Sequence, residues 1–109
     1  MNYKLYITKK AEKDILSAVD YIRNVLHNKQ AAARLLEKVE KSIGELAFMP
    51  QTHKIVDDLI LKKQGIRFIT IGNYMAFFTI NETEKSVHII RFLYGKRNWL
   101  KILKNEYDT

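Results

Sequence analysis

Residues 65–94 read GIRFITIGNYMAFFTINETEKSVHIIRFLY and contain three runs rich in isoleucine, phenylalanine, valine, tyrosine and threonine. Runs of β-branched and aromatic residues of this length are typical of strands. Between the first two runs, Gly72-Asn73 is a two-residue hairpin signal, and residues 81–84 (NETE) form a longer polar turn. We therefore expect an antiparallel meander of three strands. The runs cover Gly65 to Ile71, Tyr74 to Ile80 and Ser86 to Tyr94.

The N-terminal half is expected to hold one strand and two helices. Apolar and polar residues alternate from Tyr3 to Thr8, as in a short strand. From Lys9 to about Leu26, apolar residues recur at steps of three and four, which predicts an amphipathic helix capped by the preceding threonine. A second such helix follows Asn28, which can cap it, and Pro50 stops it within a residue or two of Met49. The link is so short that the two helices must lie antiparallel.

The remaining segments complete one α+β domain spanning residues 1–109. Residues 51–64 are expected to form a loop with partial order, and Asn98 to Lys104 one or two closing helical turns. The element order is therefore strand, helix, helix, strand, strand, strand, short helix. The helical hairpin covers one face of the sheet. The other face has only the loop and the C-terminal tail to cover it, so we expect part of it to stay exposed as a binding surface.

The 109-residue chain has no cysteine, which excludes disulfide scaffolds, thiolate zinc sites and cysteine nucleophiles. Its three histidines, His27, His53 and His88, lack metal-ligand spacing, and we expect neither a metal nor a cofactor. No glycine-rich phosphate loop or GxSxG motif is present, so conventional hydrolase chemistry is excluded. The apolar stretches are only a few residues long, and no apolar signal region is visible. We expect a cytoplasmic protein without a membrane partner.

Basic residues outnumber acidic ones, with 19 Lys and Arg against 12 Asp and Glu and a formal charge of +7. The imbalance lies in the C-terminal half, because between Asp58 and Lys104 the only carboxylates are Glu82 and Glu84. Such a surface suits a polyanion or an acidic protein. A lysine-rich surface that simply faces solvent is the alternative.

The segment RFLYGKRNW, residues 91–99, carries the clearest functional signal. It leaves a predicted strand, turns at Gly95 and presents Lys96 and Arg97 beside Tyr94 and Trp99. Cations beside aromatic rings are suited to hold phosphates and stack on bases. The same residues also fit a structural role, in which the two rings pack the tail against the sheet and the two cations face water.

Two further residues are candidates for this site. Arg67, on the first meander strand, joins the basic patch if the hairpin register places it on the open face, and otherwise lies at an edge. His88 alternates with Ile90, Phe92 and Tyr94, so it should share their face. A titratable imidazole near cations could do acid–base work, although a single histidine in a strand is more often structural.

Short motifs along nearly the whole chain resemble the RelE/ParE toxin superfamily. They are AEKDI at residues 11–15 with DYI at 20–22, AAARLL at 31–36, Pro50, GIR at 65–67, GNY at 72–74 and RFLYGKR at 91–97. The resemblance implies a βααβββ fold and the growth-inhibiting toxin of a bacterial type II toxin–antitoxin system. It also implies a toxin–antitoxin hetero-oligomer, in which a cognate antitoxin lays an extended or helical segment over the helices and the sheet.

Two kinds of target divide this superfamily. RelE-like members cut messenger RNA on the ribosome, whereas ParE-like members poison DNA gyrase. Arg97 matches the catalytic arginine of the nucleases, but Met75 stands where they usually carry an arginine, and Leu103 about where they carry a catalytic tyrosine. These apolar residues and the long helical hairpin favour the ParE-like branch.

Three functions therefore remain open. The first is a gyrase-directed toxin that acts by binding, the second a ribosome-dependent endoribonuclease, and the third a nucleic-acid-binding module without catalysis. A nuclease would use the variant catalytic set Arg97, Tyr94 and His88. The residues expected to bind the target are Arg67, Arg91, Lys96, Arg97, Trp99 and Lys101.

Overall fold

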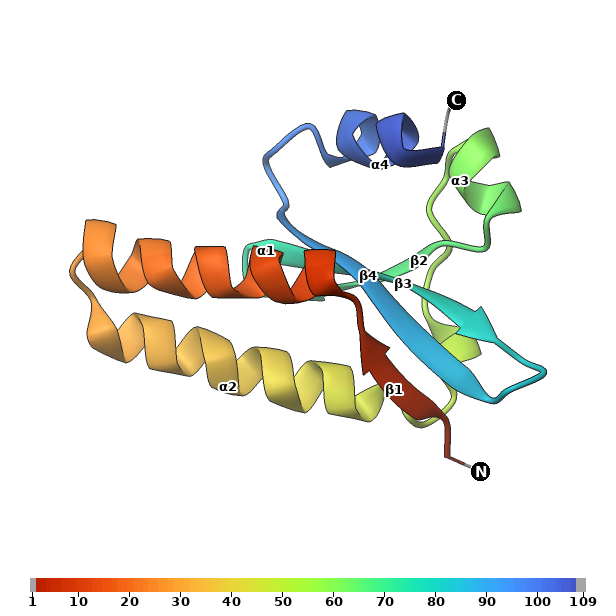
Figure 1. Ribbon diagram of the computed structural model, residues 1–109, viewed down its shortest axis with the longest axis horizontal. Helices are drawn as coiled ribbons and strands as arrows, with labels where there is room; N and C mark the ends of the chain where they lie inside the picture. Colours follow the sequence, from red (N-terminus) through yellow and green to blue (C-terminus); the bar gives the residue numbers. More distant parts are fainter. Residues whose placement is uncertain (1, 108–109) are drawn as a thin grey trace.

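The computed structural model describes residues 2–107 and contains one four-stranded sheet with helices on both faces (Figure 1). The strands are β1 (Lys4–Ile7), β2 (Arg67–Ile71), β3 (Tyr74–Asn81) and β4 (Ser86–Tyr94). The helices are α1 (Lys9–Asp20), α2 (Lys29–Glu45), α3 (Leu59–Lys63) and α4 (Trp99–Tyr107). The expected element order is confirmed, with α3 as an addition inside the expected loop.

The sheet has the strand order β1-β4-β3-β2, so the N-terminal strand lies beside the last one. β2, β3 and β4 form the expected antiparallel meander. Gly72 in the β2–β3 turn has a φ of 59°, in the left-handed region that favours glycine. β1 pairs with β4 in parallel, from Lys4 opposite Ser86 to Ile7 opposite Ile89. β1, the first strand in the chain, thus forms one edge of the sheet.

Side-chain caps begin both helices of the hairpin, as the sequence predicts. The Thr8 hydroxyl accepts a hydrogen bond from the backbone N–H of Ala11, and Asn28 Oδ1 accepts one from Ala31 at 2.9 Å. The first helix continues past α1 as a π-helical segment, Tyr21–Val25, and so extends about as far as expected. The two helices then run antiparallel (Figure 1).

α2 ends at Glu45, earlier than the predicted end near Met49. A tighter turn closes the helix, with the Phe48 N–H donating to the Glu45 carbonyl at 3.1 Å. Met49 then adopts a left-handed φ of 48°. The prediction is wrong here because the chain leaves the helix before Pro50 can stop it.

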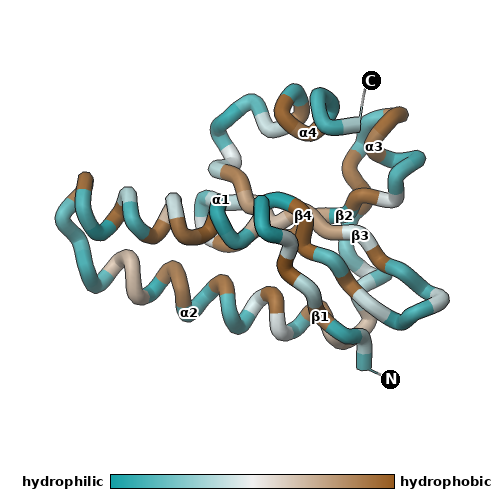
Figure 2. Tube along the Cα trace, viewed as in Figure 1, coloured by the Kyte–Doolittle hydropathy of each residue, from teal (hydrophilic) through white to brown (hydrophobic). Residues whose placement is uncertain are grey.

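The helical hairpin packs on one sheet face and forms the larger core, which we call the hairpin core. Figure 2 shows apolar and polar segments alternating along α1 and α2, as expected of helices with one buried face. Removal of these apolar side chains from water is the main force that holds the hairpin to the sheet. The buried members are Tyr3, Ala11, Ile15, Val19, Ala32, Leu35, Val39, Ile43, Leu46, Ile71, Ala76, Phe78, Val87, Ile89 and Phe92.

A second core covers the opposite face, which is expected from the sequence to stay partly open. Phe77 and Phe78 are both fully buried, because successive residues of a strand point to opposite faces. α3 and α4 cover the middle of this face by bringing Leu61 and Leu103 onto it, while Tyr6 of β1, 49% exposed, stays open at its edge, so only part of the face is exposed. The buried members of this second core are Val56, Leu61, Ile66, Phe77, Leu93 and Leu103.

The N-terminal turns of α1 continue along β4 where β1 ends. The Thr8 N–H donates to the Ile89 carbonyl at 3.0 Å, and the Phe92 N–H donates to Asp14 Oδ2 at 3.0 Å. The backbone N–H and C=O groups of β4 thus keep hydrogen-bond partners past the point where β1 ends. Such partners are needed because an unpaired backbone group at a buried strand edge is costly. This contact fixes α1 against the half of β4 that leads to the predicted site.

A β-bulge in β4 changes which residues share a face. One residue, Ile90, is inserted between two paired positions. Ile89 and Phe92 consequently lie on the same face, in the hairpin core. His88, next to Ile89, points to the opposite face. The prediction that His88 shares the face of Phe92 and Tyr94 is therefore wrong.

Candidate functional site

A surface groove of about 730 Å³ lies where the tip of the helical hairpin meets the ends of β3 and β4, and we call it the aromatic groove. It brings together Tyr94 and Arg97, two members of the variant catalytic set. Its lining residues come from the first helix, the β2–β3 turn, the start of β3, the end of β4 and the segment after β4. They are Ser17, Ala18, Tyr21, Ile22, Leu26, Asn73, Tyr74, Phe92, Tyr94 and Arg97.

Three aromatic rings pack together along the aromatic groove. The Tyr74 ring stacks on Phe92 with centroids 4.9 Å apart and meets the Tyr94 ring edge-on at 5.5 Å. Tyr74 and Tyr94 are direct partners in the β3–β4 ladder, which fixes their spacing. Burial, and next the nearby hydroxyls of Tyr94 and Tyr21, raise the pKa of Tyr74. Tyr74 therefore stays protonated at neutral pH.

The turn after β4 holds Arg97 beside the aromatic groove. The Gly95 N–H donates to the Asn73 carbonyl at 2.8 Å, which ties this turn to the β2–β3 turn. A Cβ at Gly95 would lie only 3.1 Å from that carbonyl oxygen, so a larger residue would crowd the contact. The Arg97 N–H donates to the Tyr94 carbonyl at 3.0 Å. The exposed Arg97 guanidinium has no ion-pair partner within residues 2–107, so it can bind an anionic group.

Arg91 lies inside an ion-pair cluster that joins β4, α1 and α4, which we call the Arg91 clamp. Its Nε and Nη2 donate to the two oxygens of Asp14 at 2.7 and 3.0 Å, and its Nη1 donates to Glu106. Hydrogen bonding to Asp14 is the main cause that raises the pKa of Arg91, and only 15% of its side chain is exposed. Lys10 also lies 3.6 Å from Glu106. Arg91 thus holds three elements together, which corrects the expectation that it contacts a target.

Arg67 lies at the start of β2, away from the aromatic groove. Arg67 pairs with Phe78 of β3, whereas Tyr74 of β3 lines the aromatic groove. Phe78 and Tyr74 are four residues apart, a distance of about 13 Å along a strand. Arg67 Nη1 donates to the carbonyls of Gln51 and His53, at 3.0 and 2.6 Å. Arg67 therefore fastens the segment after α2 to β2 and does not reach the aromatic groove.

His88 is also remote from the aromatic groove. It is six residues from Tyr94 along β4, roughly 15–20 Å in an extended strand. Its ring stacks on Tyr6 with centroids 5.0 Å apart, and its Nε2 lies 3.0 Å from the Ser86 hydroxyl oxygen. The structure does not bring His88 to Tyr94 and Arg97, as the variant catalytic set would require.

The remaining sequence candidates divide into one partly buried residue and two exposed ones. Trp99 packs against the second core, as the structural alternative for its ring predicts. Lys96 and Lys101 are exposed. At the two positions where the resemblance places nuclease side chains, Met75 is partly buried and Leu103 fully buried.

Sequence reasoning missed Tyr21, Tyr74 and Asp14. The two tyrosines come from different elements, and no spacing in a single sequence indicates that they meet in one groove. Asp14 occupies a polar position of the first helix, as several other charged residues do, so nothing marks it as the partner of Arg91. Only the packing of α1 along β4 reveals its role.

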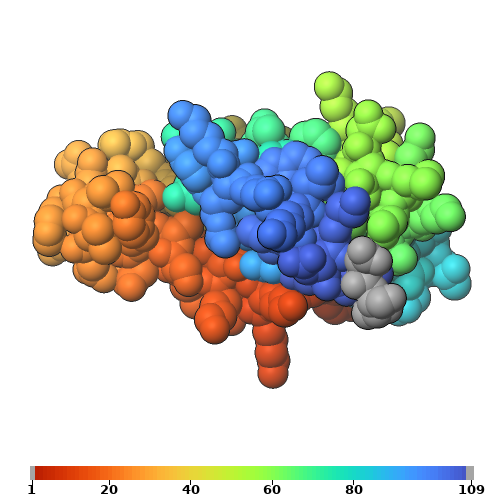
Figure 3. Space-filling view, turned by 90° about the horizontal axis from the view of Figure 1, so that it is seen from above, coloured from red at the N-terminus to blue at the C-terminus, as the bar shows by residue number. Residues whose placement is uncertain are grey.

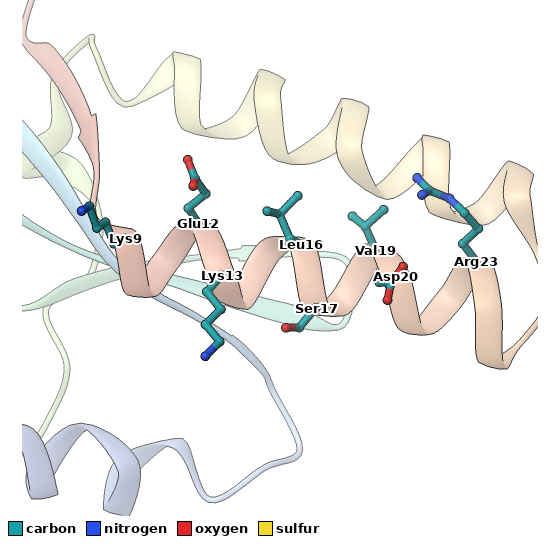
Figure 4. Close-up of a pocket in the computed structure, with 8 residues that line it drawn as sticks. All are labelled: Lys9, Glu12, Lys13, Leu16, Ser17, Val19, Asp20 and Arg23. Atoms are coloured by element: carbon teal, nitrogen blue, oxygen red, sulfur yellow. The ribbon is translucent and has the colours of Figure 1, made fainter.

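A second groove, of about 410 Å³ and mainly apolar, lies between β1, α1 and α2, and we call it the hairpin groove. Two of its apolar side chains, Ile7 and Leu16, are 48% and 58% exposed. β1 is the last strand on this side, so its outer edge has no strand partner in the described part of the chain. Figure 4 shows that Glu12 and Leu16 of α1 point toward α2, whereas Lys13 and Ser17 point to the other side.

The chemistry of the aromatic groove rests on aromatic rings, hydroxyls and one guanidinium. Within residues 2–107, no three histidine or carboxylate side chains gather where they could hold a metal ion. Nor is any helix of this part of the chain long and apolar enough to cross a membrane.

A family model covers most of the chain. It is described as the ParE toxin of the type II toxin-antitoxin system, parDE, and it matches residues 5–99. Among solved structures, the chromosomal ParDE toxin–antitoxin system from P. aeruginosa contains a similar chain with a TM-score of 0.69 and 19% identity. That match covers 84% of this chain and 95% of the other. No curated protein sequence matches significantly.

Two structures of RelE-type proteins are also similar. One is the RelBE2 toxin–antitoxin complex from Mycobacterium tuberculosis, with a TM-score of 0.60 and 20% identity over 86% of this chain and 99% of the other. The second is a mutant of the E. coli toxin RelE in the free state, with a TM-score of 0.65 and 13% identity over the whole of both chains. At these identities the likeness to solved structures shows a shared fold.

Proposed function

Because the chain belongs to the ParE toxin family of type II toxin–antitoxin systems, we propose that it stops growth by binding DNA gyrase. The matched residues, 5–99, include both helices of the hairpin, most of the sheet and the turn that carries Arg97. In this proposal the aromatic groove and the turn before α4 contact the target, and the toxin cuts no bond.

The side chains of the aromatic groove carry the proposal. Arg97 is the one charged group among its described lining residues. RNA cleavage through a 2′-hydroxyl needs a base, an acid and cations that stabilise the charged transition state. Tyr74, with its raised pKa, is a poor base, and Met75 and Leu103 offer no cation or hydroxyl at the expected nuclease positions. Tyrosines around one guanidinium instead suit tight binding to a protein surface.

We also propose that the hairpin groove receives a segment of the cognate antitoxin, giving a hetero-oligomer. The similar chains from P. aeruginosa and Mycobacterium tuberculosis belong to toxin–antitoxin assemblies. An apolar groove beside an unpaired strand edge suits a segment with regularly spaced apolar side chains. The charged side chains among the described lining of the hairpin groove are Glu12 and Glu40, so apolar contacts and the strand edge, not the basic residues of α1, would hold the segment. Leu16→Asp should therefore weaken neutralisation by the antitoxin and leave toxicity intact.

Induced expression in bacteria without the antitoxin tests the proposed function. We expect growth arrest with loss of DNA supercoiling and double-strand breaks, while messenger RNA stays intact. Arg97→Ala should reduce the arrest, and Arg34→Ala, at an exposed position of α2, should leave it unchanged. Messenger RNA cut at codon-phased positions would contradict the proposal.

A ribosome-dependent endoribonuclease is the second candidate, because Tyr94 and Arg97 share the aromatic groove. For a nuclease, Tyr94→Phe and Arg97→Ala should each abolish cleavage of messenger RNA on purified ribosomes while ribosome binding persists. His88→Ala should have little effect, since His88 is remote from this groove. Loss of cleavage in all three variants would mean that His88 reaches the reaction after all.

A further inference from the structure

α3 and α4 pack against each other over the second core, and Figure 3 views this side of the molecule face on. Leu61 of α3 and Leu103 of α4 are fully buried beneath them. Their outer surface is rich in lysine, because Lys62, Lys63 and Lys101 are exposed, and it also carries the exposed side chains of Leu59 and Leu100. We call residues 57–64 and 96–107 the lysine lid.

The lysine lid stays positively charged after its carboxylates are counted. It holds six cations and three carboxylates, a net charge of +3. Asp58 lies 3.5 Å from Lys104 and Glu106 pairs with Arg91, so Asp57 is the one carboxylate of the lid without a cation at ion-pair distance in the described chain. The cations are Lys62, Lys63, Lys96, Arg97, Lys101 and Lys104.

The aromatic rings of the lysine lid face inward. Trp99 packs on Phe77 with ring centroids 5.2 Å apart, and Tyr107 also packs against the second core. Single-stranded nucleic acid is held mainly by exposed rings that stack on its bases, which this surface does not offer. Amino groups without exposed rings suit the phosphate backbone that a duplex presents on its outside.

We propose that the lysine lid binds the phosphate backbone of duplex DNA without reading its sequence. This inference rests on the proposed function, because the enzyme named there holds duplex DNA, to which a bound toxin would present the lid. The lid is held in place before binding. Asp58 Oδ2 accepts hydrogen bonds from the N–H groups of Ile60 and Leu61, both at 3.1 Å, and the Arg91 clamp fixes α4. Binding therefore requires little ordering of the backbone.

Fluorescence anisotropy with a labelled duplex of about 20 base pairs, measured across a salt series, tests this surface on the full chain. Two double variants of equal charge are compared. Lys62→Glu/Lys63→Glu in the lid and Lys38→Glu/Lys41→Glu at exposed positions of α2 each lower the formal charge from +7 to +3. A plot of log affinity against log salt concentration has a negative slope. The lid variant should make this slope shallower by about 2, because two phosphate contacts are lost. The α2 variant should keep the slope.

Equal slopes in the two double variants would overturn the proposal, because binding would then follow net charge alone. It would also be overturned if the wild-type chain failed to bind the duplex or bound a single strand of the same length more tightly. Circular dichroism shows whether both variants are folded. If the lid variant is not, Lys101→Gln takes its place, with an expected change in slope of about 1.

The supercoiling activity of gyrase separates this inference from the proposed function. Lid-dependent duplex binding without gyrase inhibition would support DNA binding by the lysine lid and refute the proposed function. Gyrase inhibition with an unchanged salt slope in the lid variant would support the proposed function and refute DNA binding by the lid. Each result therefore assigns the failure to one of the two proposals.

Discussion

Asp14→Ala is expected to destabilise the protein by about 3 kcal/mol, although Asp14 lies outside both cores. Its carboxylate accepts hydrogen bonds from Arg91 Nε at 2.7 Å, from Arg91 Nη2 at 3.0 Å and from the Phe92 N–H at 3.0 Å. Removing one partner of a buried ion pair costs about 3–5 kcal/mol, and an unpaired buried N–H about 1–3 kcal/mol. The remaining contact of Arg91 with Glu106 and the 15–16% exposure of both side chains keep the total near the lower end.

Urea and thermal unfolding measure this loss. For a domain of this size, about 3 kcal/mol corresponds to a fall in Tm of roughly 10–20 °C. Asp20→Ala is the control, because Asp20 is exposed and makes a side-chain hydrogen bond only to Asn24 in the described chain, so it should cost about 0.5 kcal/mol or less. In an Arg91→Met background, Asp14→Ala should cost about 1 kcal/mol, since only the Phe92 N–H then loses a partner. Equal losses of unfolding free energy in Asp14→Ala and Asp20→Ala would show that the Arg91 clamp does not stabilise the fold.

Three further outcomes are expected. Gly95→Ala should cost about 1 kcal/mol in urea unfolding and lower toxicity, because its Cβ would lie 3.1 Å from the Asn73 carbonyl oxygen; full toxicity would argue against the turn as a target contact. Leu103→Ala should cost about 3 kcal/mol by the same assay, and a loss below about 1 kcal/mol would mean that α4 does not close the second core. Burial raises the pKa of Tyr74 and Tyr107, so their contribution to stability is fully present below pH 10.0 and is lost as the pH rises through the raised folded pKa values. The double phenylalanine variant should lose less stability on passing pH 10.0, and an unchanged alkaline profile would contradict this.

Local sequence signals predict the elements of this fold well. The runs in residues 65–94 and the glycine turn between the first two predict the meander, and Thr8 and Asn28 mark the starts of the two helices. These signals depend on neighbouring residues, which a sequence displays directly. The end of α2 is an exception, because Met49 takes up a left-handed turn that no proline or glycine announces.

Contacts between distant segments were harder to predict. The pairing of β1 with β4 and the closure of the second core by α3 and α4 depend on tertiary packing, which overrides local preference. The bulge at Ile90 reverses the alternation that places His88 with Tyr94. Arginine side chains are mostly found on protein surfaces, so the sequence gives no sign that Arg91 is largely buried. Its two carboxylate partners come from distant helices and become visible only in the structure.

We propose that this toxin acts by binding gyrase through the aromatic groove. The most direct test is the supercoiling of relaxed plasmid by purified gyrase in the presence of the wild-type chain or Arg97→Ala, with messenger RNA cleavage on ribosomes measured for the same preparations. We predict inhibition by the wild-type chain, inhibition weakened about tenfold or more by Arg97→Ala, and uncut messenger RNA. Unaffected supercoiling together with Arg97-dependent cleavage of messenger RNA would show that the toxin is a ribonuclease and not a gyrase inhibitor.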